Sequence, residues 1–395
     1  MPGRPPINSG LAAQAPARKG LVDYGQNLAG VATCNTLSSN NLDIGIPTRD
    51  QPTCRRPDHP GRHTLPAAQR FEATPDSPLP RGRANPDHTL MHDMPRVLDG
   101  GLATQLETRG HDLSDALWSA RLLMSAPDEI AAVHTDYLAA GAECITTASY
   151  QASLEGFLNQ GVELAHARHL IGQSVQLAIR ARDQYWTAHG RAGSQRPWVA
   201  ASVGPYGAFL ANGAEYTGHY DRDAAGLRKF HEQRWSILAA QRPDRMLCET
   251  IPSRIEARVL AELASDQPAI PCWISLNLRD PERLADGSPL ADLVGQLDQV
   301  SAVEAIGINC VAPSIVERGI AVIRRRTRKP VIAYPNSGEV WDAAHRRWRS
   351  PQPADECEAA INRWLLAGAS LIGGCCRTDP DFVCLIQKLL SSRPR

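Results

Sequence analysis

The chain has 395 residues, enough for one large α/β domain with an extension or for two ordinary domains. Its 42 basic and 42 acidic side chains balance, so composition favours neither nucleic acid nor an anionic membrane surface as a partner. We therefore expect small-molecule ligands, and the sequence leaves the oligomeric state open.

Cysteine usage indicates the compartment. The chain has ten cysteines, and no signal-peptide-like apolar run stands at its start, which predicts a reducing, cytoplasmic location rather than a disulfide framework. No run approaches the roughly 18 to 20 apolar residues of a membrane span. Five cysteines fall inside apolar strand-like or helical patterns and are interpreted as small buried residues: Cys144, Cys248, Cys272, Cys357 and Cys384.

The first part of the chain differs from the rest. Fourteen of the 30 prolines lie in the first 95 positions, and hydrophobic periodicity is absent there. This composition predicts a disordered extension over residues 1–94, followed by one domain over residues 95–392. Met91 and Met94 stand just before the first predicted strand, so our hypothesis is that translation starts there and that the extension is an artefact of gene prediction.

From residue 96 onward, short apolar runs alternate with longer amphipathic stretches. The predicted strands are 96–99, 144–150, 198–204, 245–249, 272–277, 305–310, 330–336 and 370–375. A helical pattern with 3.6-residue spacing occupies residues 128–138, and Ser253 precedes another at the position of an N-cap.

Eight βα units predict an α/β fold of the (β/α)8, TIM-barrel type. An open doubly wound sheet is disfavoured because no glycine-rich phosphate-binding turn follows the first strand. Polar residues fall at the carboxyl ends of the predicted strands, the face that carries the active site in such barrels. These residues are Asp99, Thr147, Glu249, Asn277, Cys310, Asn336 and Cys375.

Three of the strand-end residues are thiols. Cys310 ends one predicted strand, and the adjacent Cys375 and Cys376 end another after two glycines. In a barrel both strands end on the same rim, so the three sulfurs can bind one Zn²⁺ and leave its fourth position open, as in a catalytic zinc site. The alternative is that Gly-Gly-Cys-Cys forms a tight turn with inert thiols and that Cys310 is a core residue.

The motifs resemble one known family. In chain order they are 99-DGGLATQLE, 117-LWSA, 147-TASYQ, 202-SVGPYG, 248-CET, 307-GINC, 334-YPNSGE and 373-GGCCR. Over about residues 96–390 the chain is similar to the homocysteine S-methyltransferase family, nearest to its S-methylmethionine-dependent members. The resemblance implies a zinc-dependent (β/α)8 barrel that methylates homocysteine to methionine, with Cys310, Cys375 and Cys376 as the zinc ligands.

The resemblance also implies which residues bind the amino-acid substrate. Asp99 and Glu249 match acidic positions that bind the homocysteine amino group in relatives, and two carboxylates on one rim suit an ammonium group. The alternatives are a helix-capping role for Asp99 and a structural ion pair between Glu249 and an arginine. No catalytic residue beyond the zinc site is predicted.

Two aromatic residues are candidates for the donor side of the site. Trp118 matches a family tryptophan near the methyl donor, and Tyr150 is placed to cover the zinc when substrate is absent. An aromatic face attracts a sulfonium cation, but either side chain could serve packing alone. Asn309 and Asn336 are expected to shape the rim.

The sequence therefore predicts zinc-dependent methyl transfer from a sulfonium donor, S-methylmethionine or S-adenosylmethionine, to L-homocysteine. A betaine-type enzyme, or one that methylates selenocysteine or another thiol, is the alternative within the same class. Methionine synthases are disfavoured because the chain has no room for folate and cobalamin modules. A non-catalytic barrel that binds zinc or thiols is the alternative from a different class.

Overall fold

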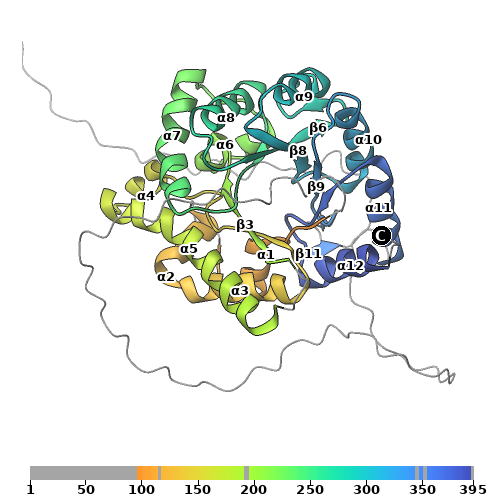
Figure 1. Ribbon diagram of the computed structural model, residues 1–395. Coiled ribbons are helices and arrows are strands. Elements are labelled where there is room, and N and C mark those ends of the chain that lie inside the picture. Colours follow the sequence, from red (N-terminus) through yellow and green to blue (C-terminus); the bar gives the residue numbers. More distant parts are fainter. Residues whose placement is uncertain (1–95, 114–116, 191–194, 343–346, 350–353, 393–395) are drawn as a thin grey trace, which may run out of the picture.

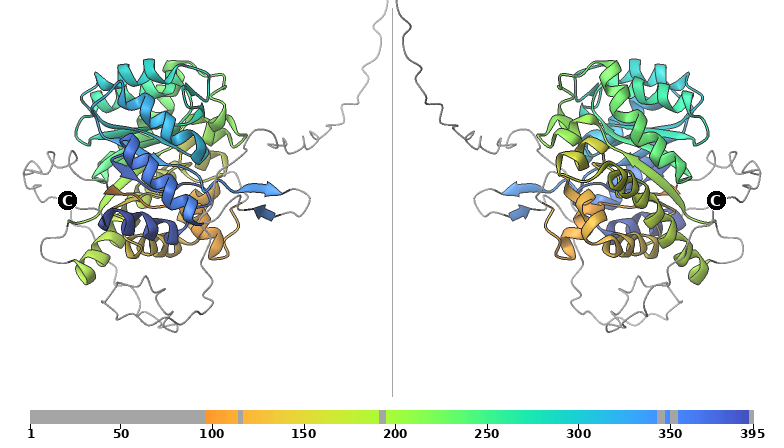
Figure 2. Two further views of the ribbon diagram at one scale, coloured as in Figure 1. Left: turned by 90° about the vertical axis from the view of Figure 1, so that its right-hand side faces the viewer. Right: turned by 90° about the vertical axis from the view of Figure 1, so that its left-hand side faces the viewer.

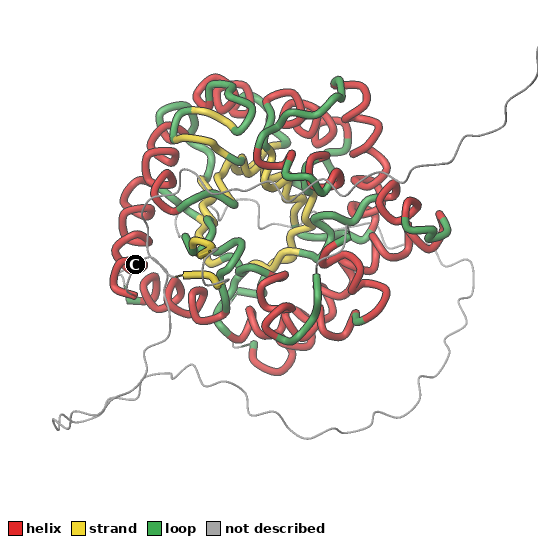
Figure 3. The backbone as a smooth tube through the Cα atoms, turned by 180° about the vertical axis from the view of Figure 1, so that it is seen from behind, coloured by secondary structure: helices red, strands yellow, loops and turns green. Residues whose placement is uncertain are grey.

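The computed structural model describes residues 96–113, 117–190, 195–342, 347–349 and 354–392. In this part of the chain a ring of strands is surrounded by helices (Figures 1 and 3). The predicted extension over residues 1–94 lies outside the described residues, so its disorder and the division at residue 95 stay predictions.

All eight predicted strands are present and form one parallel sheet. They are β1 (Arg96–Val97), β2 (Cys144–Thr146), β3 (Trp198–Val203), β4 (Arg245–Ile251), β5 (Cys272–Leu276), β8 (Val303–Asn309), β9 (Val331–Tyr334) and β12 (Leu371–Ile372). Their order is β1-β12-β9-β8-β5-β4-β3-β2, and every neighbouring pair is parallel. A parallel bridge between Leu98 and Cys144, with a 3.0 Å bond from Asp99 N to Cys144 O, joins β1 to β2, the two strands at the ends of this order. The sheet is therefore closed, and the predicted (β/α)8 barrel is confirmed.

Helices surround the ring of strands, and a few short ones lie at its rim (Figure 3). They are α1 (Leu102–Thr108), η2 (Trp118–Arg121), α2 (Leu122–Ser125), α3 (Pro127–Ala139), α4 (Leu154–Asn159), α5 (Leu164–His189), α6 (Tyr206–Leu210), η3 (Ala214–Tyr216), α7 (Ala224–Ala240), α8 (Arg254–Asp266), α9 (Leu290–Asp298), α10 (Pro313–Arg324), α11 (Ala354–Ala367) and α12 (Pro380–Ser391). α3 buries the apolar face predicted for residues 128–138. Ser253 caps α8 as predicted, because its Oγ accepts a bond from Glu256 N at 3.2 Å. Among the described helices, none is both long and apolar enough to cross a membrane.

The core has two layers because successive residues of a strand face opposite sides of the sheet. Leu247 of β4 packs inside the barrel with Trp273 of β5 and Trp198 of β3. Its neighbours Met246 and Cys248 belong instead to the larger core between strands and helices. The interior below the polar strand ends is thus filled by side chains, which confines a binding site to one end of the barrel.

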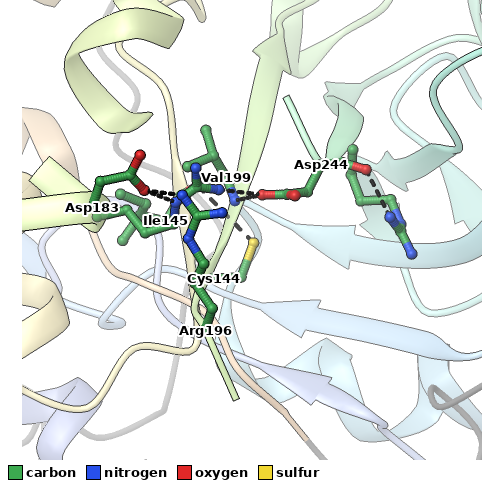
Figure 4. A network of polar contacts seen from close by, with 8 residues as sticks. Cys144, Ile145, Asp183, Arg196, Val199 and Asp244 are labelled. Atoms are coloured by element: carbon green, nitrogen blue, oxygen red, sulfur yellow. Dashed lines mark hydrogen bonds and ion pairs between the residues drawn. The ribbon is translucent and has the colours of Figure 1, made fainter. Parts of the chain in front are cut away.

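A polar network ties the opposite end of the barrel together (Figure 4). The Asp244 carboxylate accepts a bond from Val199 N at 2.7 Å and pairs with the buried Arg182 guanidinium at 2.8 Å. Arg182 and Arg196 both pair with Asp183. Val199 and Asp244 lie at the amino ends of β3 and β4, so this network supports the fold away from the polar rim.

Two antiparallel hairpins were not predicted. β6 (Leu278–Asp280) pairs with β7 (Arg283–Leu284) after β5, and β10 (Val340–Asp342) pairs with β11 (Arg347–Arg349) after β9. The β10–β11 hairpin projects beyond the barrel (Figure 2). Both follow the carboxyl end of a barrel strand, where loop insertions leave the barrel intact.

The cysteine assignment needs one correction. Cys357 in α11 and Cys384 in α12 are disulfide-bonded, so the expectation of free thiols is wrong for these two. α11 and α12 pack against each other, a tertiary contact that local sequence patterns do not reveal. Cys144, Cys248 and Cys272 are fully buried and form no disulfide bond, as expected.

Candidate metal and substrate site

The structure brings the three predicted thiols together. The Sγ atoms of Cys310, Cys375 and Cys376 lie within 4.8 Å of one another, and those of Cys310 and Cys376 are 3.6 Å apart. Cys310 follows the last residue of β8, and the other two follow β12 by three and four residues. Three soft sulfur atoms at this spacing could each supply one ligand to a single metal ion.

The backbone around the thiols is held in uncommon conformations. Cys310 has φ of 53°, in the left-handed region, and its carbonyl accepts a 3.0 Å bond from Asn277 Nδ2. A Cβ on Gly374 would collide with the Thr378 hydroxyl, which itself bonds to the Cys375 carbonyl at 2.7 Å. A glycine is therefore required before the cysteine pair, because the chain turns back tightly on itself there.

Asn309 links the thiol cluster to β4. Its Oδ1 accepts a 2.7 Å bond from Thr250 N, and its Nδ2 donates to Thr250 Oγ1 at 2.8 Å and lies 3.9 Å from Cys375 Sγ. Asn309 thus shapes the rim as expected. Asn336 is outside the cavity lining, and its backbone N donates to Val311 O at 3.0 Å.

A cavity of about 450 Å³ opens beside the thiols, a volume typical of small-molecule sites. Its lining includes seven residues predicted from the sequence: Asp99, Thr147, Tyr150, Glu249, Cys310, Cys375 and Cys376. They come from the carboxyl ends of β1, β2, β4, β8 and β12, as the barrel prediction requires.

Asp99 is buried at the cavity wall. Its Oδ2 accepts a 2.6 Å bond from Thr146 N, and the Thr146 hydroxyl donates to the same carboxyl group at 3.0 Å. Burial raises the pKa of Asp99 to about 8 despite these donors. The carboxyl does not cap α1, whose N-cap residue is Gly101 and which has no side-chain cap.

Glu249 lies within β4, which runs two residues further than predicted. A register shift between Cys248 and Ile251, with Thr250 at φ of 59°, interrupts the pairing of β4 with β5 at this point. Such irregularities are common next to active sites, where they change the direction in which a side chain points. The Glu249 carboxyl accepts a bond from the Ser202 hydroxyl, and burial raises its pKa to about 7. Among the described residues, the groups that act on the Glu249 carboxyl are Ser202, Tyr334 and Cys376, and no arginine pairs with it.

The comparisons with known proteins agree on one family. The family model described as homocysteine S-methyltransferase matches residues 96–390. The chain belongs to the homocysteine S-methyltransferase family. It is 43% identical over 299 residues to homocysteine S-methyltransferase YbgG of Bacillus subtilis, covering 75% of this chain and 95% of that one. It is 44% identical over 294 residues to the homocysteine S-methyltransferase of Escherichia coli, covering 74% and 94%.

A solved structure of a family member has the same fold. The metallated form of the homocysteine methyltransferase MmuM from Escherichia coli matches with a TM-score of 0.69 and 40% identity. The match covers 77% of this chain and 99% of that one. The family named from the sequence motifs is therefore confirmed.

The two aromatic residues suggested by the family resemblance differ in how they are placed. Tyr150 lines the cavity, and burial raises the pKa of its phenol well above the usual value, so the phenol stays neutral. Its carbonyl accepts a 3.4 Å bond from the buried Arg234. Trp118 begins η2, but its side chain lies outside the described residues, so its donor-side role stays a prediction.

Sequence reasoning missed two residues that line the cavity in this structure. The Tyr216 hydroxyl lies 3.4 Å from Cys310 Sγ, and the neighbouring Glu215 faces the same cavity. Both belong to η3, which is not at a strand end. The available signal was a pair of flanking turn glycines, Gly213 and Gly218, with φ of 85° and 66°.

Proposed function

We propose that this protein is a zinc-dependent homocysteine S-methyltransferase that uses a sulfonium donor, S-methylmethionine or S-adenosylmethionine, and forms methionine. The observation that carries the proposal is the cluster of Cys310, Cys375 and Cys376 on the wall of a cavity that also holds two buried carboxyl groups. The family names of the relatives support the reaction, and the metallated state of the MmuM structure supports a metal.

The donor set fits the proposed metal. Three cysteine sulfurs from two loops can each supply one ligand atom, and thiolates favour zinc among the common divalent ions. Bound Zn²⁺ would lower the pKa of an incoming thiol, which in free cysteine is about 8.5, and so keep the homocysteine sulfur deprotonated at neutral pH.

The protein's own residues would orient the amino acid. Asp99 and Glu249 have buried carboxyl groups whose raised pKa values fall when an ammonium group comes within bonding distance. The homocysteine ammonium is the proposed partner, and Thr146 and Ser202 fix the two carboxyls in position for it. The nucleophilic sulfur then forms a bond to the donor methyl carbon while the bond from that carbon to the sulfonium sulfur breaks, and a neutral thioether leaves.

The test measures zinc content together with methionine formation by the full chain. S-methylmethionine, S-adenosylmethionine and betaine are offered separately with homocysteine. About one zinc per chain is expected from a three-cysteine site, with turnover on a sulfonium donor. Turnover with betaine but with neither sulfonium compound would reject the sulfonium donor. Bound zinc without turnover, whichever methyl donor or thiol acceptor is offered, would favour the non-catalytic barrel.

Matched variants test whether the predicted cysteines bind the zinc. Cys310→Ser and Cys375→Ala are expected to lose zinc and turnover while circular dichroism remains that of a folded barrel. Cys248→Ala is the control, because this free thiol is buried in the core and does not line the cavity. Unchanged turnover in Cys310→Ser would contradict the proposed site.

A further inference from the structure

The η3 segment is built to hold Glu215 in one place. Gly213 and Gly218 bracket it in left-handed conformations, and Gly218 N donates to Ala214 O at 2.8 Å. A Cβ on Gly207 of α6 would lie 2.5 Å from Glu215 N and 2.9 Å from its Cα. The backbone of Glu215 thus rests directly on α6, and only glycine at position 207 permits this approach.

The next residue anchors the segment to the thiols. The Tyr216 hydroxyl lies 3.4 Å from Cys310 Sγ, so η3 spans from α6 to the candidate metal ligands. Glu215 lines the cavity between these two contacts. Its position is therefore fixed on both sides before any ligand binds.

The Glu215 carboxylate differs from the other acidic groups of the cavity. Its Oε2 is buried and has no hydrogen-bond partner among the described residues. Asp99 has Thr146 as donor, Glu249 has Ser202, and Glu107 pairs with the Arg377 guanidinium at 3.6 Å. A buried carboxylate oxygen without a partner is costly, and a cation that enters the cavity would offset this cost.

That cation is not the metal held by the thiols. The group of potential ligand atoms within 4.8 Å of one another contains only the three cysteine sulfurs within the described residues, and Glu215 is not part of it. The proposed homocysteine ammonium already has Asp99 and Glu249. The remaining positive charges in the proposed reaction, a sulfonium group and an α-ammonium group, belong to the methyl donor.

We propose that Glu215 binds the sulfonium group of the methyl donor and thereby selects cationic donors. The inference rests on the proposed function and adds a donor-binding residue to it. Methyl transfer converts the sulfonium into a neutral thioether, so the attraction to Glu215 is lost when the reaction is complete. Glu215 therefore favours the substrate over its demethylated product, which aids exchange of one for the other.

The test is a steady-state comparison of Glu215→Gln with the wild type, using S-methylmethionine and homocysteine. Loss of a charged contact predicts an increase of about 10- to 100-fold in the KM for S-methylmethionine. The homocysteine KM, the zinc content and inhibition by methionine should stay within about threefold, because the substitution removes an interaction with the sulfonium group of the donor alone. Glu215→Asp, which retains the charge, should recover part of the loss. Glu232→Gln on the outer helix α7 is the control.

A second variant tests the position of Glu215 rather than its charge. Gly207→Ala should push η3 from α6 and raise the donor KM although Glu215 is retained. An unchanged donor KM in Glu215→Gln would overturn the inference and leave the proposed function standing. Equal weakening of donor and methionine would place Glu215 at the amino-acid ammonium instead and also overturn it.

A binding measurement separates this inference from the proposed function. Calorimetric titration of S-methylmethionine into the zinc-loaded protein without homocysteine requires no turnover. If the wild type binds the donor but shows no methyl transfer, the proposed function fails while the weaker binding expected for Glu215→Gln still tests the inference. Equal donor affinity in both proteins would reject it.

Discussion

Replacing Asn309 with alanine tests how the rim holds the thiols. The side chain is fully buried and joins β8 to β4 through two bonds to Thr250, at 2.7 and 2.8 Å. Alanine leaves Thr250 N, a buried backbone donor, without its acceptor and removes the amide donor 3.9 Å from Cys375 Sγ. The substitution therefore affects both stability and the thiol cluster.

The magnitude follows from these contacts. An unsatisfied buried backbone donor costs about 1 to 3 kcal/mol, and loss of the second bond adds about 1 kcal/mol. We expect the zinc-free protein to lose about 2 to 4 kcal/mol of unfolding free energy on this basis. A residue that orients metal ligands typically changes metal affinity by about 10- to 100-fold when removed, so zinc affinity should fall within that range.

Two assays measure the two effects separately. Urea unfolding of the chelator-treated protein should show a lower midpoint at an unchanged m-value, and competition with a chromophoric chelator reports the zinc affinity. Asn159→Ala is the matched control, because Asn159 is exposed at the end of α4. A destabilisation of Asn309→Ala below about 0.5 kcal/mol, the size of an ordinary surface effect, with unchanged zinc affinity would refute the reasoning.

Three further predictions concern single side chains. Glu249→Gln should raise the homocysteine KM about tenfold and leave the zinc content intact, and a normal KM would reject its role with the ammonium. Tyr216→Phe removes the hydroxyl 3.4 Å from Cys310 Sγ, so zinc affinity should fall about three- to tenfold in chelator competition. His134 in α3 is fully buried, and burial lowers its pKa from 6.5 to about 4. The unfolded chain binds a proton below pH 6.5 that the folded chain does not, so stability falls with decreasing pH, by about 1.4 kcal/mol at pH 5.5. His134→Leu should remove this loss in unfolding experiments at pH 5.5 and 8, and an unchanged pH dependence would argue against it.

The sequence predicted the parts of the site that follow from strand periodicity. Cys310 and Cys375 stand at the ends of apolar runs, and parallel strands of a closed barrel bring such ends to one rim. The same rule placed Asp99 on the cavity wall. Glu249 was also found, although β4 continues past it and a register shift, which no local pattern indicates, interrupts its pairing there.

The missed features depend on tertiary contacts. Glu215 and Tyr216 reach the cavity because α6 has a glycine where η3 crosses it, a packing relation invisible to periodicity. The disulfide-bonded state of Cys357 and Cys384 likewise depends on how α11 and α12 lie against the barrel. Their helical patterns were equally consistent with free buried thiols.

The place of β12 between β1 and β9 has a consequence for the order of events during synthesis. The first strand of the barrel can pair with its neighbour on this side only after nearly the whole domain has been made. Cys375 and Cys376 follow that last strand, so the complete set of three thiols forms only when the ring closes. A nascent chain on the ribosome therefore presents Cys310 alone, and metal capture by all three ligands marks a finished barrel.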